Sequence, residues 1–490
     1  MLDFKECLTK TQEIGYIVGI QEYLIYVSGL PSLKLEEMVI TESLKIGIVF
    51  RLREEVAEIL VFNTENLRIG ERVAKTNSFF KIPCSFNLLG RIINSLGLPI
   101  DEKGPVLGEK EYLPIKKEVP GITQRKRITK PLETGVMIVD ILVPIGYGQR
   151  ELVIGDAKTG KTTFLLQTMV NQAKKGVICI YVGIGKEVSA IKAVESYLKE
   201  MNVFEKTIII AGTSKDITPL NYLAPFCGMT LSEYFQSKGK NVLIVFDDLT
   251  RHAQFYREIS LLVKRLPGRS AYPGDIFHLH AELLERAGNI INSQGKETSI
   301  TALPVVETLE NDLSGYIQTN LMAMTDGHIF FDVNESKRGK LPPVNTFLSV
   351  SRVGNQTKTP LERELALWIR KILAEYQRIK DLSRFGEELS KESQEILELG
   401  EKIEILFNQD SKTIIPRKIQ LLLSGLLISN FWKGKSENVM KREIKTILEN
   451  KEEILKIKEI VFEKIESLLE LEKITRDLFV PKVKKILYQF

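Results

Sequence analysis

A chain of 490 residues is too long for one small hydrophobic core, so we expect two to four domains. Hydrophobic residues make up 43% of the chain and charged residues 27%, and no apolar run approaches the roughly 18 residues of a membrane-spanning helix. The net charge of +5, from 68 Lys and Arg against 63 Asp and Glu, does not indicate a nucleic-acid-binding protein.

The N-terminal part has the pattern of short β-strands. Segments 15–20, 23–27, 46–50 and 59–62 are rich in β-branched and aromatic residues, and polar or turn residues separate them. Such spacing predicts a small antiparallel barrel or sandwich, which we assign to residues 1–85. The first residues carry acids and no apolar core, so we expect no signal peptide.

The middle of the chain alternates apolar β-rich runs with helical patterns. The runs are 151–154, 177–182, 207–210, 242–246 and 299–303. Continuous apolar strands between helices predict a mostly parallel sheet covered on both faces. We assign this α/β core to residues 86–358.

The last part, residues 359–490, is predicted to be a helical bundle. Its apolar residues step by four, three, four and three, which places them on one helix face. They are Leu365, Ile369, Ile372, Tyr376 and Ile379. From residue 438 to 487, Lys and Glu alternate around Ile and Leu, as on a solvated face over an apolar stripe.

A phosphate-binding loop is the sharpest signal. Residues 155–162, Gly-Asp-Ala-Lys-Thr-Gly-Lys-Thr, fit GxxxxGK[ST] between a predicted strand and a predicted helix. Backbone N–H groups of such a loop and the helix N-terminus face the phosphates of ATP or ADP, Lys161 reaches the β- and γ-phosphates, and the Thr162 hydroxyl can bind Mg²⁺. The expected nucleotide contacts are Gly155, Asp156, Lys158, Thr159, Gly160, Lys161, Thr162 and Thr163.

A second nucleotide signal is the apolar strand 242–246, which ends in Asp247 and Asp248. Many buried strands end in Asp at a turn, but beside a phosphate loop we favour Asp247 as the acid on the Mg²⁺ side, acting through water.

With these elements in place, the chain resembles the alpha subunits of rotary F-type ATP synthases, or a divergent F-type-like ATPase, from about Gly15 to the final helices. Four blocks carry the resemblance: 143–152 (VPIGYGQREL), 267–275 (PGRSAYPGD), 279–287 (LHAELLERA) and 348–354 (LSVSRVG). The resemblance implies a β-barrel crown, a recombinase-type P-loop core and a helical C-terminal domain.

The resemblance also implies partners. Three alpha subunits alternate with three catalytic beta subunits around a gamma-type central shaft, at the cytoplasmic face of a membrane that only the complex touches. It implies that Arg352 is an arginine finger, which stabilises the charge of the transferring phosphoryl group in the neighbouring active site. Without the resemblance, a structural salt bridge is the better interpretation of Arg352.

The resemblance implies a chain that does not hydrolyse ATP. Catalytic subunits carry a glutamate that orients water after the strand that follows the phosphate-loop helix, and alpha subunits usually have glutamine. Here Lys186 stands there, and a protonated lysine cannot accept a proton. A shifted alignment would bring Glu187 into this place.

Several positions depart from the family pattern. The phosphate loop has Ala157 and Lys158 where Arg-Gln is common, and Leu341 stands where an arginine of the adenine pocket is expected. Of two glutamines that usually line the base, only Gln409 is matched, with Ser411 near the second. Residues 1–14 are shorter than the helix that docks the peripheral stalk, so we expect altered stalk docking.

Two alternatives stay open from the sequence. One is a self-sufficient homohexameric ATPase of the export-apparatus type, which needs Glu187 as its catalytic residue. The other is a Rho-like RNA translocase, which needs basic and aromatic residues on the barrel, whereas residues 36–42 are acidic and apolar.

Overall fold

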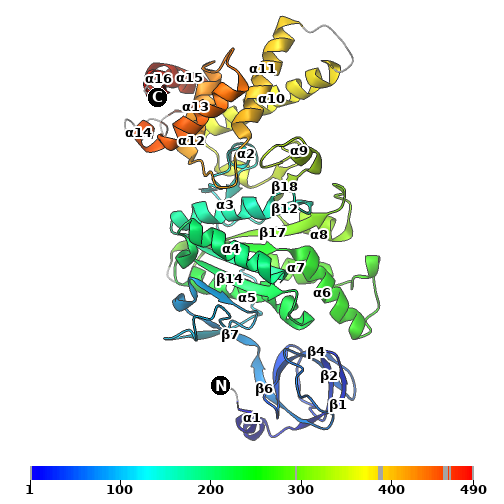
Figure 1. Ribbon diagram of the computed structural model, residues 1–490. Helices are drawn as coiled ribbons and strands as arrows, with labels where there is room; N and C mark the ends of the chain where they lie inside the picture. The colour runs from blue at the N-terminus through cyan, green and yellow to red at the C-terminus, as the bar shows by residue number, and fades with distance from the viewer. Residues whose placement is uncertain (1–2, 293–294, 384–389, 456–461, 463–464, 488–490) are drawn as a thin grey trace. The chain divides into compact units, whose positions relative to one another are not determined.

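The computed structural model describes residues 3–292, 295–383, 390–455, 462 and 465–487 (Figure 1). The chain divides into two compact units. The first unit comprises Met1–Arg127, Ala173–Glu307 and Leu313–Thr325. The second unit comprises Ile128–Gln172, Thr308–Asp312 and Asp326–Phe490.

The first unit begins with a closed antiparallel barrel, drawn in blue in Figure 1. In barrel order its strands are β1 (Gly15–Gln21), β2 (Leu24–Ser28), β5 (Ala57–Val61), β4 (Ile46–Leu52), β3 (Glu37–Thr41) and β6 (Arg72–Phe79). Alternate residues such as Ile17, Val39 and Ile59 face inward and are fully buried. Helix α1 (Phe4–Thr11), capped by Asp3, packs on the barrel through Phe4 and Cys7.

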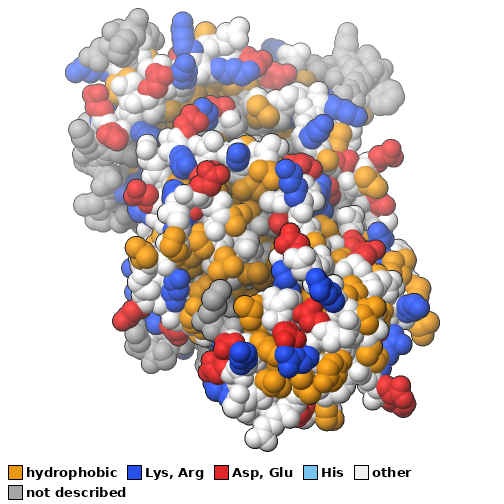
Figure 2. Space-filling model, turned by 60° about the horizontal axis from the view of Figure 1, so that its bottom comes forward, with side chains coloured by type: hydrophobic (Ala, Val, Ile, Leu, Met, Phe, Trp, Pro, Cys, Tyr) orange, Lys and Arg blue, Asp and Glu red, His pale blue; other side chains and the backbone are white. Residues whose placement is uncertain are grey.

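The barrel is attached to the rest of the first unit by apolar and polar contacts. Leu24 and Leu60 pack against Ile259 and Val263, and the Tyr23 hydroxyl donates to Glu258 Oε1 at 2.8 Å. On the outer surface, β1 leaves Tyr16, Val18 and Ile20 exposed. Figure 2 shows hydrophobic side chains interspersed with charged ones on the face turned to the viewer.

A parallel sheet forms the centre of the first unit. Its strands, in spatial order, are β17 (Glu297–Thr308), β15 (Val242–Asp247), β13 (Ile178–Lys186), β14 (Thr207–Thr213) and β8 (Arg91–Ile93). Strand β16 (Gly288–Ile291) pairs antiparallel with β17, and β7 (Lys81–Cys84) pairs with β9 (Glu111–Pro114). Besides α1, the α-helices of this unit are α4 (Val188–Glu200), α5 (Thr218–Ser237), α6 (Leu249–Leu262), α7 (Ile276–Leu284) and α8 (Tyr316–Met324). Strands β13, β14 and β15 are almost wholly buried, as expected of parallel strands.

The second unit combines a small sheet with the C-terminal helices. Strand β12 (Glu151–Asp156) runs parallel to β18 (Gly327–Phe331), and β19 (Val350–Ser351) is antiparallel to β18. Two short strands, β10 (Pro131–Leu132) and β11 (Ile145–Gly146), form a separate pair. The shorter segments α2 (Met137–Leu142) and α9 (Val333–Lys337) accompany α3 (Lys161–Lys174).

The C-terminal helices of the second unit run from yellow to red in Figure 1. They are α10 (Pro360–Ser383), α11 (Lys391–Phe407), α12 (Arg417–Ile428), α13 (Glu437–Glu449), α14 (Lys451–Leu455), α15 (Leu468–Ile474) and α16 (Val480–Leu487). On α10, Leu365, Ile369, Tyr376 and Ile379 are buried as their spacing predicts, and Ile372 is partly buried. The barrel, the parallel α/β core and the helical end confirm the predicted fold class. Within the described ranges, no helix has both the length and the apolar character needed to cross a bilayer.

Candidate nucleotide-binding site

The phosphate loop lies in the second unit, between β12 and α3. Position 155 requires a glycine because the Phe331 backbone lies close to it. A Cβ atom at this position would lie 2.3 Å from the Phe331 carbonyl oxygen. Lys158 has a φ of +63° and Gly160 a φ of +90°, so the backbone curls before α3 begins. The Lys161 side chain is buried, and its Nζ donates to the carbonyls of Gly155 at 2.7 Å and Asp156 at 2.6 Å. The loop therefore holds its lysine folded back over the turn.

The other predicted contacts of this loop are brought together around the same turn. Thr159 is buried and its hydroxyl donates to the Asp156 carbonyl at 2.8 Å. Thr162 and Thr163 are partly buried in the first turn of α3, where helix N–H groups attract anions. Lys158 is exposed at the tip of the turn. This arrangement can bind a phosphate chain, while the individual contacts stay predictions.

The Asp156 carboxylate holds a neighbouring segment, residues 308–312. Its Oδ1 accepts from the Thr308 hydroxyl at 2.5 Å and from the Asn311 N–H at 3.0 Å. Asn311 in turn donates to Asp332 Oδ1 at 2.8 Å. Asp156 therefore connects the loop to this segment, and its predicted contact with a nucleotide remains untested.

Gln409, the predicted base contact, is buried and bonded to backbone. Its Oε1 accepts from the Met137 N–H at 3.1 Å, and its Nε2 donates to the carbonyls of Gly135 at 2.8 Å and Thr413 at 2.6 Å. Both amide hydrogens and one oxygen lone pair are thus used within the protein. Leu341 is 53% exposed, and its carbonyl accepts from the Gln409 N–H. A direct contact of Gln409 with adenine stays a prediction.

The sequence analysis missed Gln167, on the second turn of α3. It is 3% exposed, and its Nε2 donates to the carbonyls of Asp410 at 2.8 Å and Thr413 at 3.1 Å. Together with Gln409 it fixes segment 409–413 against the helix that follows the phosphate loop. A polar residue on the buried side of that helix was the signal available in the sequence.

Asp247 lies in the first unit, at the end of β15, and is 2% exposed. Its Oδ1 is 2.6 Å from Lys186 Nζ, and its Oδ2 accepts from the Tyr181 hydroxyl at 2.7 Å. The adjacent Asp248 caps α6 by accepting from the Arg251 N–H, and burial raises the pKa of its carboxyl to about 6. The sequence analysis did not anticipate Tyr181 as a partner of the acid.

The two residues predicted to hold Mg²⁺ differ in how well they suit the ion. The Thr162 hydroxyl at the start of α3 is an oxygen donor of the kind that Mg²⁺ accepts. Asp247 has the right chemistry, but an ammonium group already contacts one oxygen and would repel a second cation. The contact with Lys186 disfavours direct binding of the ion by Asp247, and the role through water predicted from the sequence stays a prediction.

Lys186 and Glu187 point to different environments. Lys186 ends β13 and its ammonium reaches Asp247, within the first unit. Glu187 stands just before α4, is exposed and makes no side-chain capping bond. Lys186 stands at the expected water-orienting position, and the carboxylate of Glu187, next to it in the sequence, is exposed to solvent.

Arg352 directly follows β19 in the second unit. Its N–H donates to the Asp326 carbonyl at 3.2 Å, and the preceding Ser351 hydroxyl donates to the Pro144 carbonyl at 2.6 Å. The side chain is exposed and, within the described residues, its guanidinium has neither an ion pair nor a hydrogen bond. The Asp326 carboxylate is bonded instead to Arg150, at 2.8 Å. The structural salt bridge considered from the sequence is therefore not found there.

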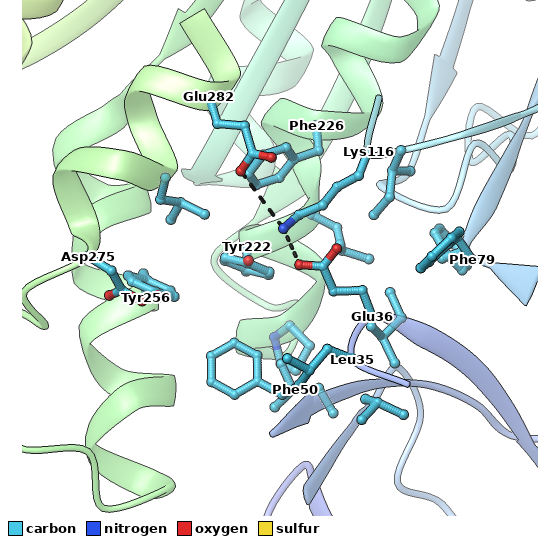
Figure 3. A pocket seen from close by; sticks show the side chains of 18 of the residues that line it. Leu35, Glu36, Phe50, Phe79, Lys116, Tyr222, Phe226, Tyr256, Asp275 and Glu282 are labelled. Atoms are coloured by element: carbon cyan, nitrogen blue, oxygen red, sulfur yellow. Dashed lines mark hydrogen bonds and ion pairs between the residues drawn. The ribbon is translucent and has the colours of Figure 1, made fainter. Parts of the chain in front are cut away.

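The first unit also contains a pocket of about 320 Å³ that the sequence did not indicate (Figure 3). Barrel residues such as Phe50 and core residues such as Tyr222 and Tyr256 line it. Lys116 bridges Glu36 and Glu282 across it, with Lys116 Nζ 3.8 Å from Glu282 Oε2. None of the predicted nucleotide contacts line this pocket.

Comparison with known proteins identifies the family. The family model described as "ATP synthase alpha/beta family, nucleotide-binding domain" matches residues 135–351. The model described as "ATP synthase alpha/beta chain, C terminal domain" matches residues 356–486.

Among curated relatives, the chain is 43% identical over 424 residues to the ATP synthase subunit alpha of Carsonella ruddii (strain PV), covering 85% of this chain and 88% of the relative. It is 40% identical over 422 residues to that of Clostridium botulinum (strain Hall), covering 86% and 83%. For Caldanaerobacter subterraneus subsp. tengcongensis the identity is 41% over 395 residues, covering 80% and 78%. The chain therefore belongs to the ATP synthase alpha/beta family, as an alpha-type subunit of an F-type ATP synthase.

Proposed function

We propose that this subunit holds ATP or ADP on its phosphate loop without hydrolysing it and lends Arg352 to the active site of a neighbouring beta-type subunit. The observation that carries the proposal is the exposed guanidinium of Arg352 on a backbone fixed by Ser351 and Asp326. A guanidinium without an ion-pair partner in its own described chain is available to a phosphoryl group on another subunit. Apolar residues around it, Phe347, Leu348 and Val350, are exposed as well, which suits a subunit contact.

The proposal that this subunit does not hydrolyse ATP rests on Lys186, the residue at the water-orienting position. Lys186 is bound to Asp247 and carries a positive charge, so it cannot take a proton from water. Glu187 is exposed before α4, and among the described residues its carboxylate has no hydrogen bond or ion pair that would position it as a base. Similarity to ATP synthase alpha subunits over most of the chain favours this proposal over the export-type and Rho-like alternatives.

Nucleotide contacts are proposed for the phosphate loop, with Lys161 on the phosphates and Gln409 on the base side. A magnesium ion that accompanies the nucleotide would be held by the Thr162 hydroxyl and phosphate oxygens, and would neutralise phosphate charge. Asp247 as the second magnesium residue is the prediction from sequence, and Lys186 competes with it.

The assembly we propose is an alternating hexamer with beta-type subunits around a gamma-type shaft. Membrane contact is proposed only through other subunits, at the cytoplasmic face. We propose that the complex does not bind nucleic acid.

The test is a reconstituted complex with Arg352→Ala, Arg352→Lys and the control Arg363→Ala. Arg363 is also exposed and without a side-chain partner in the described chain. We expect Arg352→Ala to lower kcat for ATP hydrolysis by about 10³-fold, Arg352→Lys to recover little, and Arg363→Ala to change nothing. ATP binding by the isolated full chain should be unchanged in all three. Full hydrolysis by the Arg352→Ala complex would exclude the arginine finger.

A further inference from the structure

Three residues lie in one row across the small sheet of the second unit. Glu151 of β12 is paired with Gly327 of β18, and Gly327 is paired with Ser351 of β19. Paired residues of neighbouring strands point to the same face of a sheet, and Gly327 leaves that face open for the Glu151 carboxyl group. A Cβ atom at position 327 would lie 2.7 Å from Glu151 Oε2. The row therefore places a buried carboxyl group beside the strand that ends just before Arg352.

Gln149 joins this carboxyl group to Ser351. Its Nε2 donates to Glu151 Oε2 at 2.5 Å and to the Ser351 hydroxyl oxygen at 3.2 Å, while its Oε1 accepts from the Gly146 N–H at 2.8 Å. The Ser351 hydroxyl in turn donates to the Pro144 carbonyl at 2.6 Å. Gln149, Glu151 and Ser351 are all buried, so the loss of one partner would leave the others without water to replace it.

Arg150, between Gln149 and Glu151, supports the backbone of Arg352 through Asp326. Its N–H donates to the Asp326 carboxylate at 2.9 Å and its guanidinium at 2.8 Å. The Asp326 carbonyl accepts from the Arg352 N–H at 3.2 Å. Residues 149–151 thus hold the chain on both sides of the bond between residues 351 and 352, while the Arg352 side chain is exposed.

The surroundings of Glu151 favour the neutral form of its carboxyl group. Burial raises its pKa well above the usual range and the Asp326 charge adds to this, against the lowering effect of the Gln149 hydrogen bond. Glu151 Oε1 is buried and has no hydrogen bond within the described part of the chain. The Val350 carbonyl oxygen borders the same space above Gly327 and would repel a carboxylate. A neutral amide of the same shape should therefore be able to replace this acid.

We propose that Gln149 and Glu151 are positioning residues, which hold Ser351 so that the Arg352 side chain leaves the sheet from one fixed place. The inference rests on the proposed function, since it concerns the guanidinium that is lent to the neighbouring active site. A cation stabilises the transferring phosphoryl group most when its position is fixed before the reaction. Loss of the buried anchor should therefore lower kcat, while KM for ATP changes little.

The first experiment compares reconstituted complexes that carry Glu151→Ala, Glu151→Gln, Ser351→Ala or Ser424→Ala. Ser424 of α12 is the matched control for Ser351, because its buried hydroxyl also donates to a backbone carbonyl, that of Gln420, at 2.8 Å. We expect Glu151→Ala and Ser351→Ala to lower kcat for ATP hydrolysis by about 10- to 100-fold, with KM within about twofold of wild type. Glu151→Gln and Ser424→Ala should each keep at least about half of the wild-type kcat.

Two results of this comparison would overturn the inference. One is a wild-type kcat in the assembled Glu151→Ala and Ser351→Ala complexes. The other is a loss in Ser424→Ala as large as that in Ser351→Ala, which would reflect general damage to the second unit. If Glu151→Ala does not assemble, Ser351→Ala with its control decides alone.

The second experiment adds Glu151→Ala or Ser351→Ala to the Arg352→Ala complex. We expect kcat to fall by less than about twofold further, because no guanidinium remains to be positioned. A further loss of about tenfold or more would overturn the inference while leaving the arginine finger intact. Full hydrolysis by the Arg352→Ala complex itself would instead contradict the proposed function, and the inference with it.

Discussion

Arg286, which follows α7, forms a bidentate ion pair with Glu233 of α5 in the interior of the first unit. Arg286 Nε lies 2.9 Å from Glu233 Oε1, and Nη2 lies 3.0 Å from Oε2. Arg286 also donates to the Ile115 carbonyl at 2.8 Å and to the Thr230 hydroxyl at 3.0 Å. The arginine of the block 279–287 is thus a structural residue that joins three segments.

We expect Glu233→Gln to destabilise the protein by about 3 kcal/mol, because it leaves a buried guanidinium without its counter-charge. Urea unfolding of the full chain measures the change. The control is Glu111→Gln, which breaks the exposed pair with Lys238 and should change the unfolding free energy far less, because solvent screens the two charges. If both substitutions lowered the unfolding free energy equally, the buried pair would contribute no more to stability than the exposed pair.

Gly155→Ala tests the close approach at the phosphate loop. The added methyl group would overlap the Phe331 carbonyl, so β12 and β18 must separate at the point where the loop begins. We expect a loss of about 1–3 kcal/mol in stability, and a clear fall in ATP affinity measured by calorimetry. Gly121→Ala is the control, since a Cβ atom there meets nothing within 4 Å. Normal ATP binding by Gly155→Ala would contradict this account of the loop.

Glu187→Gln distinguishes a regulatory subunit from a self-sufficient ATPase. The side chain is exposed and holds no capping bond, so its charge serves no contact in the described chain. We expect the hydrolysis rate of the complex to remain within about a factor of two, whereas loss of a true general base costs about 10²-fold or more. Steady-state ATPase assays of the assembled complex provide the measurement. A large loss would revive Glu187 as a catalytic residue.

Asp101 gives a prediction for pH. Burial alone would raise the pKa of its carboxyl, but hydrogen bonds from Arg91 and from backbone N–H groups lower it to about 2. A depressed carboxyl pKa stabilises the fold above the unfolded value of about 4, and the contribution disappears as pH falls from about 4 to about 2. Since the side chain is 3% exposed, we expect about 2 kcal/mol.

The difference in unfolding free energy between wild type and Asp101→Asn measures this contribution. It should be constant at neutral pH and shrink across that acidic window. A difference that does not depend on pH would show that the ion pair with Arg91 does not set the titration of Asp101.

Much of the fold could be predicted because its signals are local. The apolar runs such as 242–246 became buried parallel strands, and the spacing from Leu365 to Ile379 became one buried face of α10. The phosphate loop was equally local, since its glycines and lysine adjoin a strand and a helix.

The contacts that define the site were not predictable in the same way. The pair of Lys186 with Asp247 depends on the register of β13 against β15, which places Gly183 opposite Asp247. Whether Arg352 forms an ion pair within its own chain depends on which nearby carboxylates are already paired. The carboxylate of Asp326 is paired with Arg150. Residue types showed that Gln409 can make hydrogen bonds, but only the backbone around it decides with which groups.

Closure of the N-terminal barrel restricts how neighbours can approach it. Each of its six strands has a hydrogen-bonded strand on both sides, including β1 with β6. It therefore offers no edge on which a foreign strand could extend the sheet by backbone pairing. A partner of the barrel must therefore contact its outward side chains, such as Tyr16 and Val18, because it cannot pair with the barrel's backbone.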